Sequence, residues 1–209
     1  MNKHFKIYQL WPIPVYESII PPRKKWKDAI LKLEYERTHV KNSDISKDRY
    51  IFKNEESLFD LKKEILLHCD NFLRKYLNVK NNAQFYFTNS WCNIHRPKDS
   101  SQIHYHSGGL ISGVYYPIYP NNSGDIIFHR NPIWTNLFPN SIQFDYDEYD
   151  NINSNVYTLN INEGTIVLFP SHLEHSVKEN LSNDKRYSIA FNLFVKGKFG
   201  NEEYELELK

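Results

Sequence analysis

The first third of the chain carries apolar residues at helical spacing. Trp26, Ile30 and Leu33 share one face of a segment that follows a pair of prolines, and proline is favoured at the start of a helix. A longer apolar stripe predicts a second helix over about 57–77, and its members are Leu58, Leu61, Ile65, Cys69, Phe72 and Tyr76. Because such stripes bury one helix face against another element, we expect both helices to support a sheet.

From Gln84 onward the pattern changes to short runs rich in Val, Ile, Tyr and Phe, broken by clusters of Gly, Asn, Ser and Pro. Eight runs predict strands, at 84–95, 102–106, 112–118, 125–129, 155–161, 164–169, 174–178 and 186–196. Eight strands after a helical region are typical of a jelly-roll, or double-stranded β-helix, in which two sheets enclose a cavity. We therefore predict a mainly β fold with N-terminal helices.

The length of the chain predicts a single domain over residues 1–209. Residues 1–83 would form an extended N-terminal segment and the supporting helices, and residues 84–196 the double-stranded β-helix core. The long connection 130–153 contains several aromatic residues and an acidic run from Asp145 to Asp150. Compact domains seldom keep such long loops without use, so either a lid that contacts the substrate or a solvated insertion fits this segment.

Composition excludes some classes of partner. With 26 Lys and Arg against 25 Asp and Glu, the formal charge is +1, so no strong field attracts nucleic acid or an acidic membrane. The N-terminal stretch is interrupted by prolines and resembles an extended segment rather than a signal peptide, and no run approaches the roughly 20 apolar residues of a membrane span. We expect a cytoplasmic protein, in which Cys69 and Cys92 are buried free thiols rather than a disulfide.

Two histidines in one predicted strand are candidate metal ligands. His104 and His106 are two residues apart, so their side chains point to the same face of a strand and both imidazoles can reach one point in space. Alone, a His-x-His pair is a weak signal, because two surface or hydrogen-bonded histidines have the same spacing.

A third histidine strengthens the metal hypothesis. Glu163-Gly164 precedes the apolar run Thr165–Phe169, and a proline corner then leads to a strand that begins with His175. His172 and Glu174 are competing donors, but His172 falls in the corner itself and Glu174 would face away from His175 along the strand. We therefore predict that His104, His106 and His175 are the catalytic metal ligands.

The last predicted strand has one polar and one apolar face. Arg186, Ser188, Ala190 and Asn192 share the first face, whereas Tyr187, Ile189, Phe191 and Leu193 share the second. The polar row would be costly to bury without a ligand or partners. A guanidinium beside a hydroxyl suits a carboxylate, since the planar fork donates two charge-assisted hydrogen bonds, although an internal Asp or Glu would satisfy it equally.

The order His-x-His, distal His and Arg-x-Ser resembles the iron(II)- and 2-oxoglutarate-dependent oxygenases, and in particular a group common in phages and bacteria. The resemblance spans nearly the whole chain, and its motifs are Leu10–Tyr16, Ser90–Asn93, His104–His106, Ser112–Tyr116, Phe169–Ser171, His175–Val177 and Arg186–Asn192. Each motif is modest in specificity; their order and spacing together are more specific.

This resemblance implies a double-stranded β-helix that holds Fe(II) at its mouth and uses 2-oxoglutarate and O2. Arg186, assisted by Ser188, would bind the distal carboxylate of 2-oxoglutarate, and Tyr116 and Asn93 would be further cofactor-binding residues. The reaction implied is decarboxylation of 2-oxoglutarate to succinate and CO2, coupled to hydroxylation of a small-molecule or peptide substrate. The sequence identifies neither the substrate nor the oligomeric state.

The chain departs from the superfamily at one position. An Asp or Glu usually stands two residues after the first His, where this chain has His106. Three neutral imidazoles would leave iron(II) with its full double charge and would strengthen chelation of an anionic cosubstrate. Alternatively, Asp125 or a water completes the set of ligands in place of His106.

Two rival functions remain open from sequence. A cupin-type metalloenzyme shares the His-x-His motif and the Gly164–Pro170 spacing before a distal His. However, this chain lacks the Glu that a cupin usually has shortly after the His-x-His pair, and a cupin has no need of Arg186. A non-catalytic jelly-roll, such as a structural or sugar-binding module, would need neither the histidines nor the arginine to meet in one cavity.

Overall fold

The computed structural model describes residues 12–38, 42–80, 83–131, 144–200 and 205–208, together with residues 6, 8, 10 and 203. Its helices are α1 (Lys24–Lys32), α2 (Ile51–Asn54) and α3 (Phe59–Asp70), with a 3-10 turn at Glu56–Leu58 before α3 and a π-helical turn at Asn71–Tyr76 after it. The two predicted helices are therefore present. Within the described residues, no helix is both long and apolar enough to cross a bilayer.

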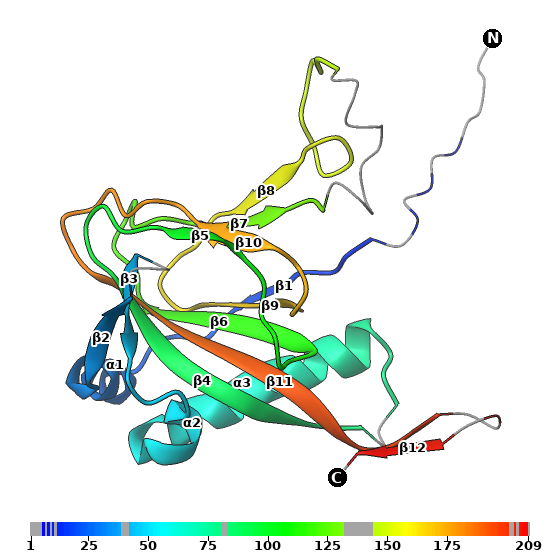
Figure 1. Ribbon diagram of the computed structural model, residues 1–209, viewed down its shortest axis with the longest axis horizontal. Coiled ribbons are helices and arrows are strands. Elements are labelled where there is room, and N and C mark those ends of the chain that lie inside the picture. The colour runs from blue at the N-terminus through cyan, green and yellow to red at the C-terminus, as the bar shows by residue number, and fades with distance from the viewer. Residues whose placement is uncertain are drawn as a thin grey trace.

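The strands are β1 (Tyr16–Ile19), β2 (Tyr35–Thr38), β3 (Ser43–Ser46), β4 (Gln84–His95), β5 (Ser101–His104), β6 (Ile111–Ile118), β7 (Ile126–His129), β8 (Val156–Leu159), β9 (Thr165–Pro170), β10 (His175–Val177), β11 (Arg186–Gly200) and β12 (Glu205–Leu208). They form two antiparallel sheets. The larger sheet has the order β1-β9-β6-β11-β4-β3-β2, with β12 paired to β11, and the smaller has the order β5-β10-β7-β8. The smaller sheet lies over one face of the larger, and α3 crosses the other face (Figure 1).

Alternation along β9 explains how one sheet serves two cores. Ile166 and Leu168 pack into the cluster that contains the helices, whereas Val167 and Phe169 pack into the cluster between the two sheets. A strand that is covered on both faces needs a continuous apolar run, and this run is what the sequence shows. The fold is thus the predicted one, mainly β with a helical layer.

The predicted division of β11 into two faces is observed. Its apolar row lies in the helix-side core, where Phe191 is fully buried and packs its ring against Phe52 and Phe87, with centroids 5.9 and 5.4 Å away. Its polar row faces the opposite way, toward the smaller sheet, and Arg186 and Ser188 line a cavity there. The amphipathic strand therefore separates a structural face from a chemical one.

The pattern missed β1, β2 and β3, which join the larger sheet at its two edges. β2 reads YERT and β3 reads SDIS, so neither has the apolar alternation that marks a strand. Polar contacts hold them instead: Arg37 of β2 bonds both carboxylate oxygens of Asp99 at 2.5 and 2.6 Å, and Asp44 of β3 accepts from Arg96 at 2.8 Å. Residues 132–143 of the predicted long connection lie outside the described residues.

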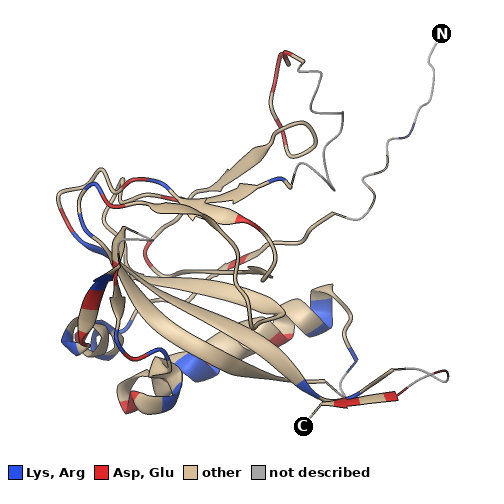
Figure 2. Cartoon of the chain, in the orientation of Figure 1, with Lys and Arg blue, Asp and Glu red and all other residues tan. Residues whose placement is uncertain are grey.

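Cys69 and Cys92 are both free and buried, as expected. Burial raises the pKa of the Cys92 thiol to about 12, which keeps it protonated and unreactive at neutral pH. Charged residues of both signs are interspersed over helices, loops and sheet edges, and most of the strand surface carries other residues (Figure 2). This distribution agrees with the near-zero net charge.

We predict that Phe191→Ala lowers the free energy of unfolding by about 3–5 kcal/mol, because it removes a fully buried ring and leaves a cavity in the helix-side core. Urea denaturation of the purified protein measures this. Leu67→Ala, at a position on α3 that is 66% exposed, is the control and should change stability by no more than about 0.5 kcal/mol. A small effect at Phe191 would contradict the assignment of this face to the core.

Candidate metal centre

Strand pairing brings two of the predicted ligands together. β10 pairs with β5 so that His175 lies directly opposite His104, and paired residues in antiparallel strands point to the same face. Their ring centroids are 4.3 Å apart. His175 is buried and His104 is half-buried at the edge of the smaller sheet. The two imidazoles, 71 positions apart in the chain, therefore occupy one place in the fold.

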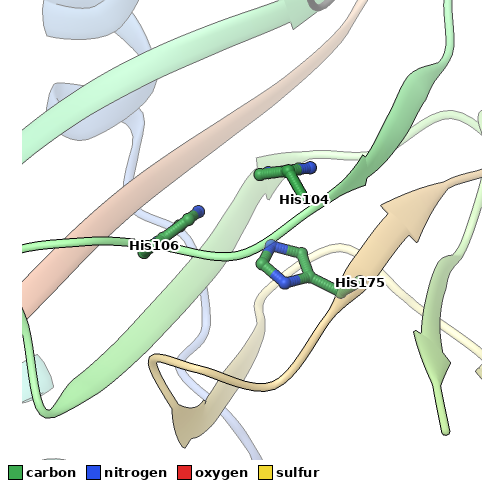
Figure 3. A group of neighbouring side chains, drawn as sticks. All are labelled: His104, His106 and His175. Atoms are coloured by element: carbon green, nitrogen blue, oxygen red, sulfur yellow. The ribbon is translucent and has the colours of Figure 1, made fainter. Parts of the chain in front are cut away.

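His106 reaches the same place by a different route. The strand ends at His104, so His106 lies in the following loop, and the expectation that strand geometry alone would orient it is wrong. Its backbone N–H donates to the carbonyl of Ser171 at 3.0 Å, which places its ring 5.4 Å from that of His104 and 5.0 Å from that of His175. One nitrogen from each ring lies within 4.8 Å of the others, and the three side chains gather around one point (Figure 3).

Hydrogen bonds at Nδ1 fix the tautomers of all three rings. His104 Nδ1 lies 2.8 Å from the carbonyl oxygen of Gln102, and His175 Nδ1 lies 3.0 Å from that of Leu173. His106 Nδ1 lies 2.8 Å from Oδ1 of Asn192. Because carbonyl and amide oxygens only accept, Nδ1 carries the hydrogen in each ring and the neutral imidazole keeps its lone pair on Nε2. This is the state in which histidine binds a metal.

The competing donors are not part of the cluster. His172 is exposed and Glu174 is half-buried, and neither joins the group of possible ligands among the described residues. Asp125 is engaged elsewhere, because its Oδ1 accepts from the hydroxyl of Tyr119 at 2.9 Å and from the N–H of Ile161 at 3.1 Å. Three imidazoles with fixed tautomers are a suitable donor set for a divalent first-row metal ion, iron included.

One cavity connects the histidines with the other predicted site residues. Arg186, Ser188, Tyr116 and Asn93 all line it, together with His104, His106 and His175. Register explains the arrangement, since Ser188 pairs with Asn93 across β11 and β4 and so shares its face. The structure thus gathers every predicted site residue around a single cavity.

Arg186 is a buried cation that forms no ion pair with any carboxylate in the part of the chain that the structure describes. It is 1% exposed, and its NH1 donates to the carbonyl oxygens of Ser123, at 2.9 Å, and Gly124. Its Nε finds no hydrogen-bond partner among the described residues, and no described carboxylate lies within ion-pair distance. Burial lowers the pKa of the guanidinium, which measures the cost of holding this charge away from water. An anion in the cavity would offset that cost.

Tyr116 provides a neutral donor near this cation. Burial raises the pKa of its phenol to about 12, although the charge of Arg186 opposes the shift. Tyr116 is therefore protonated at neutral pH and can donate to an oxygen. On β4 of the same sheet, Asn93 accepts from the indole Nε1 of Trp91 at 3.2 Å, which fixes the orientation of its amide.

Sequence reasoning gave no role to several residues that line the cavity. His95 pairs with Arg186 across β4 and β11, and its Nε2 lies 2.8 Å from the hydroxyl of Ser101. His95 stands two positions after Asn93 on the same strand, so alternation alone could have placed it on this face. Trp91 and Phe169 form an apolar wall beside the histidines. The ring centroid of Trp91 lies 5.5 Å from that of His106, and the ring centroid of Phe169 lies 4.8 Å from that of His175.

Comparison with known proteins agrees with this geometry. Residues 89–192 match a family model described as "Putative 2OG-Fe(II) oxygenase", where 2OG is 2-oxoglutarate. These bounds include all three histidines, Arg186 and Ser188. No curated protein matches the chain in sequence.

Several solved structures share the fold. A 2OG-Fe(II) oxygenase family oxidoreductase from Burkholderia pseudomallei aligns with a TM-score of 0.57 at 12% identity, over 81% of this chain and 75% of that one. HygX from Streptomyces hygroscopicus, solved with nickel, 2-oxoglutarate and hygromycin B, aligns at 0.57 and 10% identity, over 87% and 82%. A Pseudomonas putida prolyl-4-hydroxylase aligns at 0.51 and 11%, over 86% and 92%. These likenesses confirm the double-stranded β-helix.

We predict that the chain binds one divalent metal ion and that His175→Ala weakens this binding by more than about 100-fold. Loss of a residue that only supports a ligand typically costs about 10–100-fold in metal affinity, and loss of a ligand should cost more. Titration calorimetry of the metal-free protein with Co(II) measures the affinity. His172→Ala removes an exposed imidazole three residues away and should leave the affinity unchanged. Equal losses in the two variants would exclude the assignment of His175 as a ligand.

Proposed function

This chain belongs to the 2OG-Fe(II) oxygenase family, and we propose on that basis that it hydroxylates a C–H bond of a small-molecule or peptide substrate, with release of succinate and CO2. One observation carries the proposal. A single cavity holds three convergent imidazoles and a buried guanidinium that no described carboxylate neutralises. Iron(II) and an anionic cosubstrate are complementary to these two features.

The histidines would hold the iron. His104, His106 and His175 each present Nε2 as the nitrogen with the lone pair, since Nδ1 donates to an oxygen in each ring. Three neutral ligands leave the double charge of the ion uncompensated, which favours an anionic chelator in the remaining positions. When bound, iron and 2-oxoglutarate supply the oxidising chemistry with O2, and the protein binds, orients and excludes water.

Arg186 would bind the distal carboxylate of 2-oxoglutarate. A carboxylate at the guanidinium replaces the missing counter-charge with charge-assisted hydrogen bonds. Ser188 lies two positions further along the same face of β11, and the protonated phenol of Tyr116 adds a further donor to the cavity wall. Asn93 lies opposite Ser188 in the ladder, where it would contact the cosubstrate or the substrate.

Apolar side chains would keep water from the reacting centre. Trp91, Phe169 and Val114 line the cavity next to the histidines. An apolar lining that excludes water strengthens the electrostatic interactions inside the site and limits side reactions of the oxidant. This arrangement fits an oxygenase better than either rival, because neither a cupin that works without 2-oxoglutarate nor an inert jelly-roll accounts for the unneutralised Arg186.

We expect iron(II) and 2-oxoglutarate, added anaerobically to the metal-free protein, to give the weak visible charge-transfer band of the chelate. Arg186→Ala should weaken 2-oxoglutarate binding by about 2–5 kcal/mol, at least about 30-fold in Kd, because it removes the charge that pairs with the distal carboxylate. Titration of the band with 2-oxoglutarate measures the affinity.

Two variants accompany this measurement. Arg186→Lys keeps the charge but loses the planar fork, so it should bind with intermediate affinity. Arg130→Ala is the matched control, because Arg130 donates to the carbonyls of Asn151 and Ile152 and does not line the cavity. Metal binding without any band, or a band that is insensitive to Arg186, would refute the proposed use of 2-oxoglutarate.

A further inference from the structure

We propose that Asn192 is a positioning residue for the metal centre: its side-chain amide holds His106 in the tautomer and orientation that present Nε2 to the ion. The inference rests on the proposed function only in taking His106 as a ligand. It also explains how this chain uses an imidazole at the position where the superfamily usually has a carboxylate.

His106 needs such support more than the other two histidines do. The Nδ1 of His104 and of His175 bonds a backbone carbonyl two residues earlier in the chain, so these contacts are local. His106 lies beyond the end of β5, and its Nδ1 bonds a side chain that is 86 positions away, at 2.8 Å. The orientation of this ring therefore depends on which end of the Asn192 amide faces it.

The amide of Asn192 is itself fixed from two sides. Its Nδ2 donates to Oδ1 of Asn89 at 2.8 Å, and its Oδ1 accepts from the hydroxyl of Ser112 at 2.7 Å. The Ser112 hydroxyl lies 2.8 Å from that of Ser171, which can donate to it in turn. A flipped amide would turn its NH2 toward His106 and would require the opposite tautomer, with the lone pair on Nδ1. Asn89 and Ser112 together disfavour that state.

Sheet register builds this relay, which consists of Asn89, Asn192, Ser112 and Ser171. On β11, Asn192 pairs with Asn89 of β4 on one side and with Ser112 of β6 on the other, so the three side chains form a row across the centre of the larger sheet. Asn192 and Ser112 are 2% and 0% exposed. A row of buried polar side chains is costly unless every member is hydrogen-bonded. Ala190 lies on the same face of β11 and is apolar, so packing on this face does not by itself require polar residues.

The relay also joins the two segments that carry the ligands. Ser171 lies in the corner before His175; its hydroxyl contacts Ser112 and its carbonyl accepts from the N–H of His106. Gly109, in the loop between His106 and β6, lies against Asn192 and Ser171. A Cβ on Gly109 would lie 2.9 Å from both the Cβ of Asn192 and the hydroxyl of Ser171, so a side chain at residue 109 would press on the relay.

The test is a double-mutant cycle on metal affinity in the full-length protein, with Co(II) alone as the probe and titration calorimetry and the visible ligand-field spectrum as readouts. Asn192→Leu, which cannot accept a hydrogen bond, should weaken Co(II) binding about 10–100-fold, the usual cost of losing an outer-shell partner. Asn192→Asp keeps an acceptor and should retain most of the affinity and the wild-type spectrum.

The second arm separates positioning from general stability. In a His106→Ala background Asn192→Leu should cause almost no further loss, because the ring on which it acts is gone. Equal fold losses in both backgrounds would show a structural role and overturn the inference. Ser176→Ala is the matched control: Ser176 adjoins His175, but its hydroxyl bonds His129 at 2.8 Å and it does not line the cavity, so its loss should not change Co(II) affinity.

Three further outcomes are decisive. If Asn192→Leu does not fold, Asn89→Ala at a half-buried position removes the acceptor for the amide and should still weaken Co(II) binding; unchanged affinity would overturn the inference. If the wild-type protein does not bind Co(II), the proposed function fails and the inference fails with it. If the wild type and Asn192→Leu bind Co(II) equally, only the inference fails.

Discussion

The pairing of β10 with β5 is the constraint on which the metal centre depends. It sets His175 opposite His104, and because side chains alternate along a strand, a slip of one residue would turn one of the two imidazoles to the outer face. The register is held from both sides, since β10 also pairs with β7, where Phe128 stands beside His175 and packs its ring against Phe169. The apolar core between the sheets thus holds in place the two candidate ligands that come from strands.

The second constraint is electrostatic. Burying the guanidinium of Arg186 is costly, and the two carboxylates that act on it electrostatically, Asp125 and Asp99, are hydrogen-bonded to Tyr119 and Arg37 instead. A fold that leaves a buried charge in this state is complementary to an anion that arrives from solution. Iron(II) held by three neutral imidazoles would make a similar demand within the same cavity. A keto diacid, with one end for the metal and one for the guanidinium, meets both demands.

Sequence reasoning succeeded wherever one pattern had one structural cause. The continuous apolar run of β9 reflects apolar cores on both of its faces, whereas the alternation of β11 reflects an apolar core on one face and a polar cavity on the other. These two patterns predicted the fold class and the positions of Arg186 and Ser188. The His-x-His pair was predicted on the assumption that both histidines lie on one strand, and this is true only of His104. His106 lies past the strand, and the contacts that hold it come from Ser171 and Asn192, which are far away in sequence.

Other features could not be predicted because their causes are not local. β2 and β3 are short and polar, and they become strands through pairing with each other and with β4 and through the ion pairs of Arg37 and Arg96. Asn192 was placed on the correct face of its strand, but its role depends on neighbours from β4 and β6. The pattern along one strand predicts to which face each side chain points, whereas its neighbours on adjacent strands can be identified only from the pairing register.

Crystallography of the protein soaked anaerobically with iron(II) and 2-oxoglutarate, with anomalous scattering to locate the metal, tests the central claim most directly. The account predicts one iron bound by Nε2 of His104, His106 and His175, and the distal carboxylate of the cosubstrate on the guanidinium of Arg186. Iron bound elsewhere, or a cosubstrate whose distal carboxylate does not contact Arg186, would contradict it.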